Sequence, residues 1–195
     1  MERVVIEVDG IKTFSNKAAL DALAELAAAV PADQAIVEVG VYRGGSLRTI
    51  ALRASAHVYG VDTWGLEGAY ASGSESAANY GIDNMMIAQR AVAELPHVTL
   101  VRAFSADAAH DYDGPAIGLL YVDGEHTYDA VLTDFHAWRP YLAPEAVVAF
   151  DDYRASHRPV VDAVRRLVRD GHLAAPSVAG GRLAVCQRAQ RDLGE

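Results

Sequence analysis

The sequence is poor in cysteine, in positive charge and in long hydrophobic runs, and each shortage excludes a class of protein. Its single cysteine, Cys186, can form neither an internal disulfide nor a cysteine-rich zinc site, which predicts a reducing compartment, the cytoplasm. The 17 basic residues against 26 acidic ones leave a net charge of -9, so we expect no nucleic-acid partner. No apolar run approaches the roughly 18 residues of a membrane span, and the acidic start lacks the apolar core of a signal peptide. We therefore expect neither a membrane anchor nor export.

What the sequence does contain is the composition of an ordinary globular protein. Its 195 residues are 51% hydrophobic and 22% charged, enough to bury one core. No repeat, low-complexity segment or linker divides the chain, which favours a single domain over 1–195. Residues 1–34 form an N-terminal region, in which 4–8 suggest a short edge strand. Apolar residues at helical spacing from Leu20 to Val30 predict a helix capped by Ser15 or Asn16.

Beyond this region, short apolar runs alternate with helical patterns. The runs are 35–39, 57–61, 98–101, 117–122 and 146–150, and the helical patterns cover about 47–54, 83–94, 128–142 and 159–169. Continuous apolarity predicts strands buried on both faces, and so a parallel sheet between layers of helices. Two further short strands, 173–178 and 182–187, are joined through Gly180 and Gly181, which predicts an antiparallel hairpin at the sheet edge.

A glycine-rich turn follows the first of these buried runs, in the segment Glu38-Val-Gly40-Val-Tyr42-Arg-Gly44-Gly45-Ser46. Glycines let backbone amides approach a ligand, and the start of the following helix favours a carboxylate or phosphate. Asp62 stands 22 positions after Gly40, at the end of the next strand, where a carboxylate can accept both ribose hydroxyls. Together they indicate an adenosine-containing ligand. Tyr42 stands where a dinucleotide fingerprint has its second glycine, which favours a ligand without phosphates. The alternative is a tight turn with an ordinary strand-end acid.

Three acids follow two other predicted strands, and they converge if those strands are neighbours. Asp123 ends one strand, and Asp151 and Asp152 end the other. Three carboxylates repel one another unless a cation joins them, and oxygen ligands select a hard ion such as Mg²⁺. Glu125 is an alternative ligand. The simpler alternative is that one acid caps a helix while the others face water.

His126 follows Asp123 by three residues, which puts an imidazole beside the proposed metal as a candidate general base. The other six histidines have no recognisable partner pattern. The segment Phe104-Ser105-Ala106-Asp107 either lines an adenine pocket or is a plain loop. Trp64 opens a Gly/Ser-rich stretch, 63–82, which is a candidate lid or substrate loop.

From about Ala35 to Gln187 the chain resembles the class I S-adenosylmethionine-dependent methyltransferases. Within them it resembles the metal-dependent O-methyltransferases that act on sugars of macrolides and related natural products. The resemblance is carried by the glycine-rich segment 38–46, by Val61-Asp62, by Val122-Asp123-Gly124-Glu125-His126-Thr127-Tyr128 and by Phe150-Asp151-Asp152-Tyr153. It implies a Rossmann-like α/β fold, with a doubly wound, mostly parallel seven-stranded sheet and a C-terminal antiparallel hairpin.

The same resemblance implies two cofactors, S-adenosylmethionine and Mg²⁺. The methionine part would lie at the glycine-rich turn, the ribose at Asp62 and the adenine near Ser105 and Ala106. The residues assigned to the cofactor are Glu38, Gly40, Tyr42, Gly44, Ser46, Asp62, Ser105, Ala106 and Asp123. Asp123, Asp151 and Asp152 would hold Mg²⁺, and His126 and Asp123 would act in catalysis. Coordination would lower the pKa of an acceptor hydroxyl while His126 removes its proton.

These expectations define an O-methyltransferase for a hydroxyl of a small, glycosylated metabolite. The chain departs from the family in two places. The turn 142–146 lacks paired glycines, and the N-terminal region is short, which leaves the acceptor pocket to 63–82, assisted by a second subunit of a homo-oligomer. Three alternatives stay open: a hydroxylase-like enzyme similar to cephalosporin hydroxylase, a catechol-type O-methyltransferase, and a cofactor-binding protein without catalysis.

Overall fold

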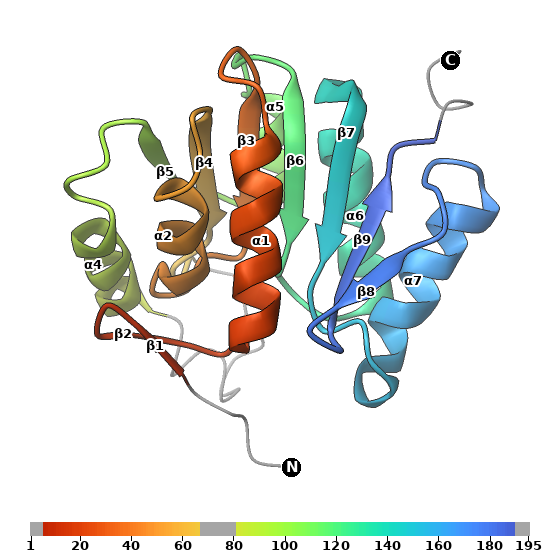
Figure 1. Ribbon diagram of the computed structural model, residues 1–195, viewed down its shortest axis with the longest axis horizontal. Helices are drawn as coiled ribbons and strands as arrows, with labels where there is room; N and C mark the ends of the chain where they lie inside the picture. The colour runs from red at the N-terminus through yellow and green to blue at the C-terminus, as the bar shows by residue number, and fades with distance from the viewer. Residues whose placement is uncertain (1–5, 67–80, 190–195) are drawn as a thin grey trace.

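The computed structural model describes residues 6–66 and 81–189, and its centre is a seven-stranded sheet in the order β5-β4-β3-β6-β7-β9-β8 (Figure 1). The strands are β3 (Ala35–Val39), β4 (His57–Asp62), β5 (Val98–Arg102), β6 (Ile117–Val122), β7 (Leu142–Phe150), β8 (Ser177–Ala179) and β9 (Leu183–Gln187). The first five are parallel, whereas β9 runs antiparallel to β7 and β8 antiparallel to β9. The predicted doubly wound sheet with a C-terminal hairpin is confirmed.

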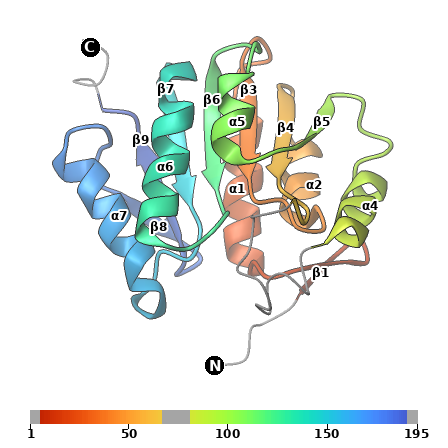
Figure 2. The same ribbon diagram turned by 180° about the vertical axis from the view of Figure 1, so that it is seen from behind.

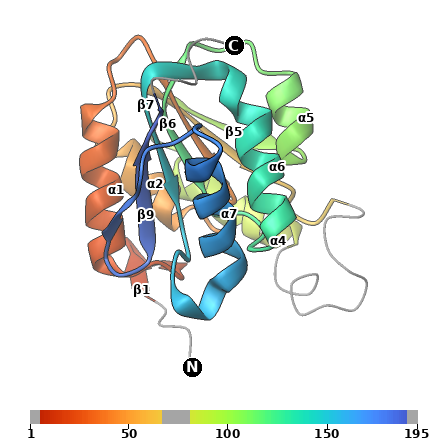
Figure 3. The same cartoon turned by 90° about the vertical axis from the view of Figure 1, so that its right-hand side faces the viewer.

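Helices cover both faces of this sheet. One layer contains α1 (Lys17–Ala29), α2 (Gly45–Ala51) and α4 (Ile82–Ala91), and the other contains α5 (Ser105–His110), α6 (Tyr128–Trp138) and α7 (Arg158–Arg169). Figures 1 and 2 show one layer each, and Figure 3 shows the sheet between α1 and α2 on one side and α5, α6 and α7 on the other. Every residue of β3 and β6 is buried, which explains why their sequences are almost entirely apolar. Glu38 in β3 is buried as well, although it carries a carboxyl group.

The start of α1 is tied to the C-terminal hairpin. The Asn16 side chain caps the helix by accepting a hydrogen bond from the backbone N–H of Ala19 at 2.9 Å, as predicted. Its amide nitrogen donates to the carbonyl of Gly180 at 2.8 Å. Leu20 and Leu23 on the same helix are buried against the sheet. One side chain thus begins the first helix and anchors the last turn.

The N-terminal strand is not an edge strand of the main sheet, which corrects the interpretation of 4–8. In the described part of that segment, β1 (Ile6–Val8) pairs antiparallel with β2 (Ile11–Thr13) in a separate two-stranded sheet. Asp9 and Gly10 connect them with φ values of 50° and 81°. An Asp-Gly pair with positive φ at both positions is a strong hairpin signal, and it closes the strand on its own neighbour.

Proline and a missed helix account for the other boundary corrections. The helix predicted over 128–142 ends at Trp138, because Pro140 lies in the short 3₁₀ turn η1 (Arg139–Tyr141), and β7 begins at once. The plain-loop alternative for 104–107 is wrong, since α5 begins at Ser105. In the last hairpin, β8 is shorter than predicted, and Leu173 contributes only an isolated bridge to Arg188.

None of the helices in the described ranges has both the length and the apolar character needed to cross a bilayer.

Gly40 is the position at which backbone packing leaves no room for a side chain. It ends β3 with φ of 90°, and a Cβ there would lie 2.2 Å from the carbonyl oxygen of Asp123. We expect Gly40→Ala to lower the free energy of unfolding by about 3 kcal/mol or more, from strain and overpacking together. Gly10→Ala is the matched control, because Gly10 has φ of 81° but nothing within 4 Å of its Cβ position. Urea denaturation measures both, and equal losses would contradict the steric explanation.

Candidate functional site

The carboxyl ends of β3, β4, β6 and β7 lie side by side, and the acids of the sequence pattern gather there. Glu38 lies within β3, Asp62 ends β4, and Asp123 follows β6. Asp151 and Asp152 follow β7 directly. Because these four strands are parallel neighbours, their ends meet at one edge of the sheet. The predicted convergence of strand-end acids is therefore present in the fold.

Asp62 is held by the glycine-rich turn. The backbone N–H groups of Val41 and Tyr42 donate to its Oδ2 at 2.9 and 2.8 Å, and that of Trp64 donates to Oδ1 at 2.8 Å. Burial raises the pKa of Asp62, although these amide hydrogen bonds offset part of the increase. Tyr42 has φ of 55° and Gly44 has φ of 82°, so the turn bends sharply toward the end of β4. The turn and the ribose-binding candidate form one unit.

Trp64 belongs to the core rather than to a lid, which corrects the expectation for this residue. Its side chain is buried, and its indole Nε1 donates to the carbonyl oxygen of Tyr42 at 2.8 Å. Trp64 thus links the end of β4 to the glycine-rich turn. Most of the candidate lid, residues 67–80, lies outside the described residues.

Glu38 is a completely buried carboxyl group among other acids. Its Oε1 accepts a hydrogen bond from the Ser46 hydroxyl at 2.5 Å, whereas no described residue supplies a partner for its Oε2. Burial raises the pKa of Glu38 well above its ordinary value, the Ser46 hydrogen bond opposes that shift, and the charges of Asp123 and Asp62 add to it. A buried carboxyl group in a negative field is stabilised either by its own proton or by a cationic donor.

Ser105 and Ala106, the predicted adenine neighbours, begin α5. The Ser105 hydroxyl oxygen accepts a hydrogen bond from Nε1 of Trp138 at 3.1 Å, and it also hydrogen-bonds Asp134. Ala106 is exposed. Asp134 is buried, and this raises its pKa to about 6 despite the Ser105 hydrogen bond. The Ser105 hydroxyl therefore supports the interior of this layer.

His126 lies between two carboxylates. Its Nε2 is 3.3 Å from Asp123 Oδ1, and its Nδ1 is 3.4 Å from Asp152 Oδ2. The Tyr121 hydroxyl donates to the other Asp123 oxygen at 3.0 Å. Burial alone would lower the pKa of His126, but the hydrogen bond to Asp123 and the charges of Asp123 and Asp152 outweigh it and raise the pKa. Glu125, the alternative metal ligand, is exposed.

Arg182 is the residue that the sequence patterns missed. Its Nε donates to Asp151 Oδ1 at 2.8 Å, and its Nη2 donates to Asp151 Oδ2 and, at 2.7 Å, to Asp152 Oδ1. Burial would lower the pKa of this guanidinium, but Asp151 and Asp152 outweigh that effect and raise it. One feature of the sequence could have indicated this role: Arg182 lies directly before β9, and β9 pairs with the end of β7 that Asp151 follows.

The contacts of Asp151 do not fit a Mg²⁺ site made of three carboxylates. Both of its oxygens accept from Arg182, and the residue is only 2% exposed. Asp152 Oδ1 accepts from Arg182 and lies 2.7 Å from Nη2 of Arg154. The Arg182 guanidinium thus binds carboxylate oxygens that the sequence analysis assigned to Mg²⁺, an ion that also needs positions for water. The ligand roles of Asp123, Asp151 and Asp152 stay a prediction.

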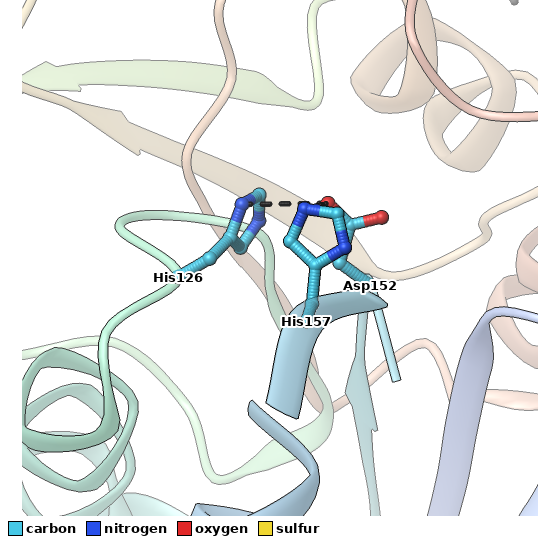
Figure 4. Close-up of side chains that lie close together, drawn as sticks. All are labelled: His126, Asp152 and His157. Carbon is cyan, nitrogen blue, oxygen red and sulfur yellow. Dashed lines mark ion pairs between the residues drawn. The ribbon is translucent and has the colours of Figure 1, made fainter. Parts of the chain in front are cut away.

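His157 was also missed, having been set aside with the histidines that lack a partner pattern. It ends the short 3₁₀ turn η2 (Ala155–His157), and its Nε2 lies 3.3 Å from Asp152 Oδ2. Figure 4 shows the His126 and His157 rings approaching the Asp152 carboxylate from the β6 end and from the η2 turn. The ring centroids are 5.6 Å apart. The partner pattern was invisible because 31 residues separate the two histidines in the sequence.

A family model described as a methyltransferase domain matches residues 37–153, the stretch that contains all of these strand-end acids. An uncharacterized protein, y4gI of Sinorhizobium fredii, is 32% identical over 126 residues, covering 60% of this chain and 13% of that protein. The uncharacterized protein R132 of Acanthamoeba polyphaga mimivirus is 25% identical over 146 residues, covering 71% of this chain and 61% of that protein. The chain thus spans less than two thirds of the length of either curated relative.

Solved structures of methyltransferases share the fold. The O-methyltransferase NovP superposes with a TM-score of 0.65 at 20% identity, covering 91% of this chain and 82% of its own. The calicheamicin methyltransferase CalS11 gives 0.63 at 20% identity, covering 87% and 77%. A methyltransferase-like protein of Streptococcus mutans, SMU.1697c in complex with SAH, gives 0.63 at 12% identity, covering 89% and 99%. At these identities the likeness establishes the architecture.

Asp134 makes the stability of this region depend on pH. Because burial raises its folded pKa from 3.8 to about 6, the folded protein favours the protonated form. The stabilisation of the folded state by protonated Asp134 is fully present below about pH 4 and is lost as the pH rises through about 6. The free energy of unfolding therefore decreases by about 3 kcal/mol over this range. We expect Asp134→Asn to abolish that decrease, measured as the free energy of unfolding between pH 4 and 7. Asp129→Asn, at an exposed position of the same helix, should keep the original profile; identical profiles for both variants would contradict the assignment.

Proposed function

The chain belongs to the family of methyltransferase domains, and from this premise we propose that it transfers a methyl group from S-adenosylmethionine to a hydroxyl oxygen of a small, glycosylated metabolite. The observation that carries the proposal is the buried Glu38 carboxyl group beside the Asp62 turn at the ends of the strands, whose Oε2 has no partner in the part of the chain that the structure describes. This arrangement favours a ligand that has both a positive charge and a sugar.

The donor groups of this site fit S-adenosylmethionine. Its ammonium group can supply the hydrogen bond that Glu38 Oε2 lacks among the described residues, and its sulfonium charge suits a cluster of carboxylates. The residues proposed to hold it are Glu38, Gly40, Tyr42, Gly44 and Ser46 for the methionine part, Asp62 for the ribose, Ser105 and Ala106 for the adenine, and Asp123. The fold shared with the SAH complex of SMU.1697c supports this choice. When bound, the cofactor supplies an electrophilic methyl group.

The same electrostatics disfavours a dinucleotide. The charges of Asp123 and Asp62 add to the burial that raises the pKa of Glu38, so the field at the turn is negative. A pyrophosphate placed at the turn would add two negative charges to this field. Tyr42 stands where the dinucleotide fingerprint has its second glycine, and this also disfavours a dinucleotide.

His126 is proposed as the general base. Asp123 Oδ1 lies 3.3 Å from Nε2 and orients the ring, which leaves the lone pair of Nδ1 to take a proton from the acceptor hydroxyl. The Asp152 carboxylate, 3.4 Å from Nδ1, stabilises the imidazolium that results. Because both carboxylates raise the pKa of His126, the ring is a stronger base than a free imidazole. Asp123 therefore acts through His126.

The nature of the acceptor is supported by two likenesses. NovP is an O-methyltransferase, and CalS11 is described as a TDP-rhamnose 3'-O-methyltransferase. These two names support the proposal of a sugar hydroxyl as the acceptor. Mg²⁺ dependence stays a prediction, and no step above depends on Mg²⁺. The following expectations also stay predictions: a cytoplasmic location, a single domain over 1–195, a lid formed by 63–82, the absence of nucleic-acid and membrane partners, and a homo-oligomer.

Binding of S-adenosylhomocysteine tests the cofactor site directly. We expect Asp62→Asn to weaken its binding by about 10- to 100-fold in calorimetric titration, because a charged acceptor of buried hydrogen bonds is lost. Asp33→Asn, an exposed substitution before β3, should bind like the parent chain. Absence of binding to the unsubstituted protein would reject S-adenosylmethionine as the cofactor and favour a protein without methyltransferase activity.

Kinetics test the base. We expect His126→Asn to reduce kcat by about 10²- to 10⁴-fold while the affinity for S-adenosylhomocysteine is unchanged. The rate should rise with pH until His126 is neutral, and Asp123→Asn should move this rise to lower pH, because it removes the carboxylate that raises the pKa. Release of S-adenosylhomocysteine in the presence of TDP-rhamnose and aryl glycosides measures the rate. His110→Asn, on the exposed end of α5, is the control, and full activity of His126→Asn would exclude this base.

A further inference from the structure

We propose that His126, Asp152 and His157 form a binding site for a first-row transition-metal ion such as Zn²⁺, held by two imidazole nitrogens and one carboxylate oxygen. Within the described ranges these three side chains can each offer one ligand atom, all within 4.8 Å of one another. The site differs from the predicted Mg²⁺ site in its chemistry, since nitrogen supplies two of its three ligands. It is a statement about metal binding, and because it uses the same Nδ1 lone pair of His126 that the proposed reaction uses as a base, a bound ion and proton transfer by His126 exclude each other.

The spacing of the donor atoms suits a tetrahedral ion. Asp152 Oδ2 lies 3.4 Å from His126 Nδ1 and 3.3 Å from His157 Nε2 (Figure 4). Ligands at 2.0–2.2 Å from a tetrahedral Zn²⁺ are about 3.4 Å apart. The two imidazole rings are nearly perpendicular, with an interplanar angle of 81°, so their nitrogens approach the carboxylate from different directions. Two of the three distances between donor atoms therefore match a tetrahedral ion, and the third is at most 4.8 Å.

The second nitrogen of His126 is already oriented as metal-binding histidines require. Nε2 lies 3.3 Å from Asp123 Oδ1, and Tyr121 holds the other oxygen of that carboxylate at 3.0 Å. A neutral ring has one N–H, which Asp123 accepts, so Nδ1 directs its lone pair at Asp152 Oδ2. Two lone pairs in contact repel each other, so Nδ1 carries either a second proton or a metal ion at this position. A carboxylate behind the ring is the usual outer partner of a metal-bound histidine.

The Asp152 carboxylate is fixed in an orientation that reserves one oxygen for the site. Arg182 Nη2 and Arg154 Nη2 both approach Oδ1, each at 2.7 Å. The two imidazole nitrogens face Oδ2 instead. Asp152 is buried, so these contacts hold the side chain in place. Arg182, the buried one of the two arginines, is sufficient to orient the ligand, and the second oxygen is left to the metal ion.

Arg154 is the residue that competes with the ion. Its Nε donates to His157 Nδ1 at 3.1 Å, which keeps the proton of a neutral ring on Nε2, the proposed ligand atom. Ser156 Oγ lies 3.1 Å from the same Nδ1 and can accept its proton once Nε2 binds metal. The Arg154 side chain is 37% exposed and can turn toward water. Removing Arg154 should therefore strengthen metal binding.

The ligand set determines which ions it favours. Imidazole nitrogen suits Zn²⁺, Co²⁺, Ni²⁺ and Cu²⁺, whereas Mg²⁺ prefers oxygen and retains several waters. Three protein ligands leave a fourth tetrahedral position for water or another oxygen ligand. Of the ions to be compared, Zn²⁺ should bind far more tightly than Mg²⁺.

The test is metal titration of the tag-free, full-length chain after EDTA treatment and dialysis. We expect one Zn²⁺ per chain by calorimetry, visible absorption bands of tetrahedral Co²⁺, and much weaker binding of Mg²⁺. His157→Asn should weaken Zn²⁺ binding at least about tenfold, and Arg154→Gln should strengthen it. His136→Ala is the matched control, because His136 and His172 form a second ring pair 5.4 Å apart. Far-ultraviolet circular dichroism verifies the fold of each variant.

Three outcomes would overturn the site. One is Zn²⁺ binding that is equal in the parent chain and in His157→Asn. Another is loss of binding in His136→Ala rather than in His157→Asn, which would move the metal to the other histidine pair. The third is weaker binding after Arg154→Gln, which would make Arg154 a supporter of the site instead of a competitor. Since every readout is binding or spectroscopy, failure of the proposed methyl transfer would not affect the result.

Discussion

Negative charge buried at the ends of parallel strands is the constraint on which the rest of this structure depends. Each strand-end carboxylate has lost water and needs a partner. Backbone amides of the glycine-rich turn hold Asp62, and the Arg182 guanidinium holds Asp151. Tyr121 and His126 hold Asp123. The turn, the hairpin and the loop after β6 are each positioned by the acid that they neutralise.

Arg182 connects this charge to the outer parts of the fold. Beyond Asp151 and Asp152, its Nη1 donates to the carbonyl of Phe14 at 2.6 Å, two residues before the Asn16 cap of α1. Asn16 joins the same region to the hairpin turn through Gly180. The first helix and the last hairpin, which lie at opposite ends of the chain, therefore meet at the site. Breaking a buried ion pair of this kind by removing one partner costs about 3–5 kcal/mol, so stability and site geometry are coupled here.

The charge also determines the kind of ligand that the site accepts. On the acid-rich side, Glu38 Oε2 has no partner among residues 6–66 and 81–189, which suits the proposed cationic ligand that can donate hydrogen bonds. On the other side, His126 faces Asp123 and Asp152, and either a second proton or a metal ion can relieve the contact between Nδ1 and Asp152. The two proposals therefore share a cause. Both follow from carboxylates that neighbouring residues neutralise only in part.

Local patterns in the sequence determined much of this protein. Unbroken apolar runs indicated the parallel sheet, Ser15 or Asn16 was expected to begin α1, and Asp62 and Asp123 at strand ends indicated the candidate site. These signals act between near neighbours in the chain. Tertiary structure alone decided that Trp64 is buried, that Arg182 reaches Asp151, and that His157 reaches Asp152. The Arg182 contact depends on how the last hairpin pairs with β7, and the His157 contact on how the turn after β7 packs against the loop after β6. Sequence periodicity does not encode contacts between segments so far apart.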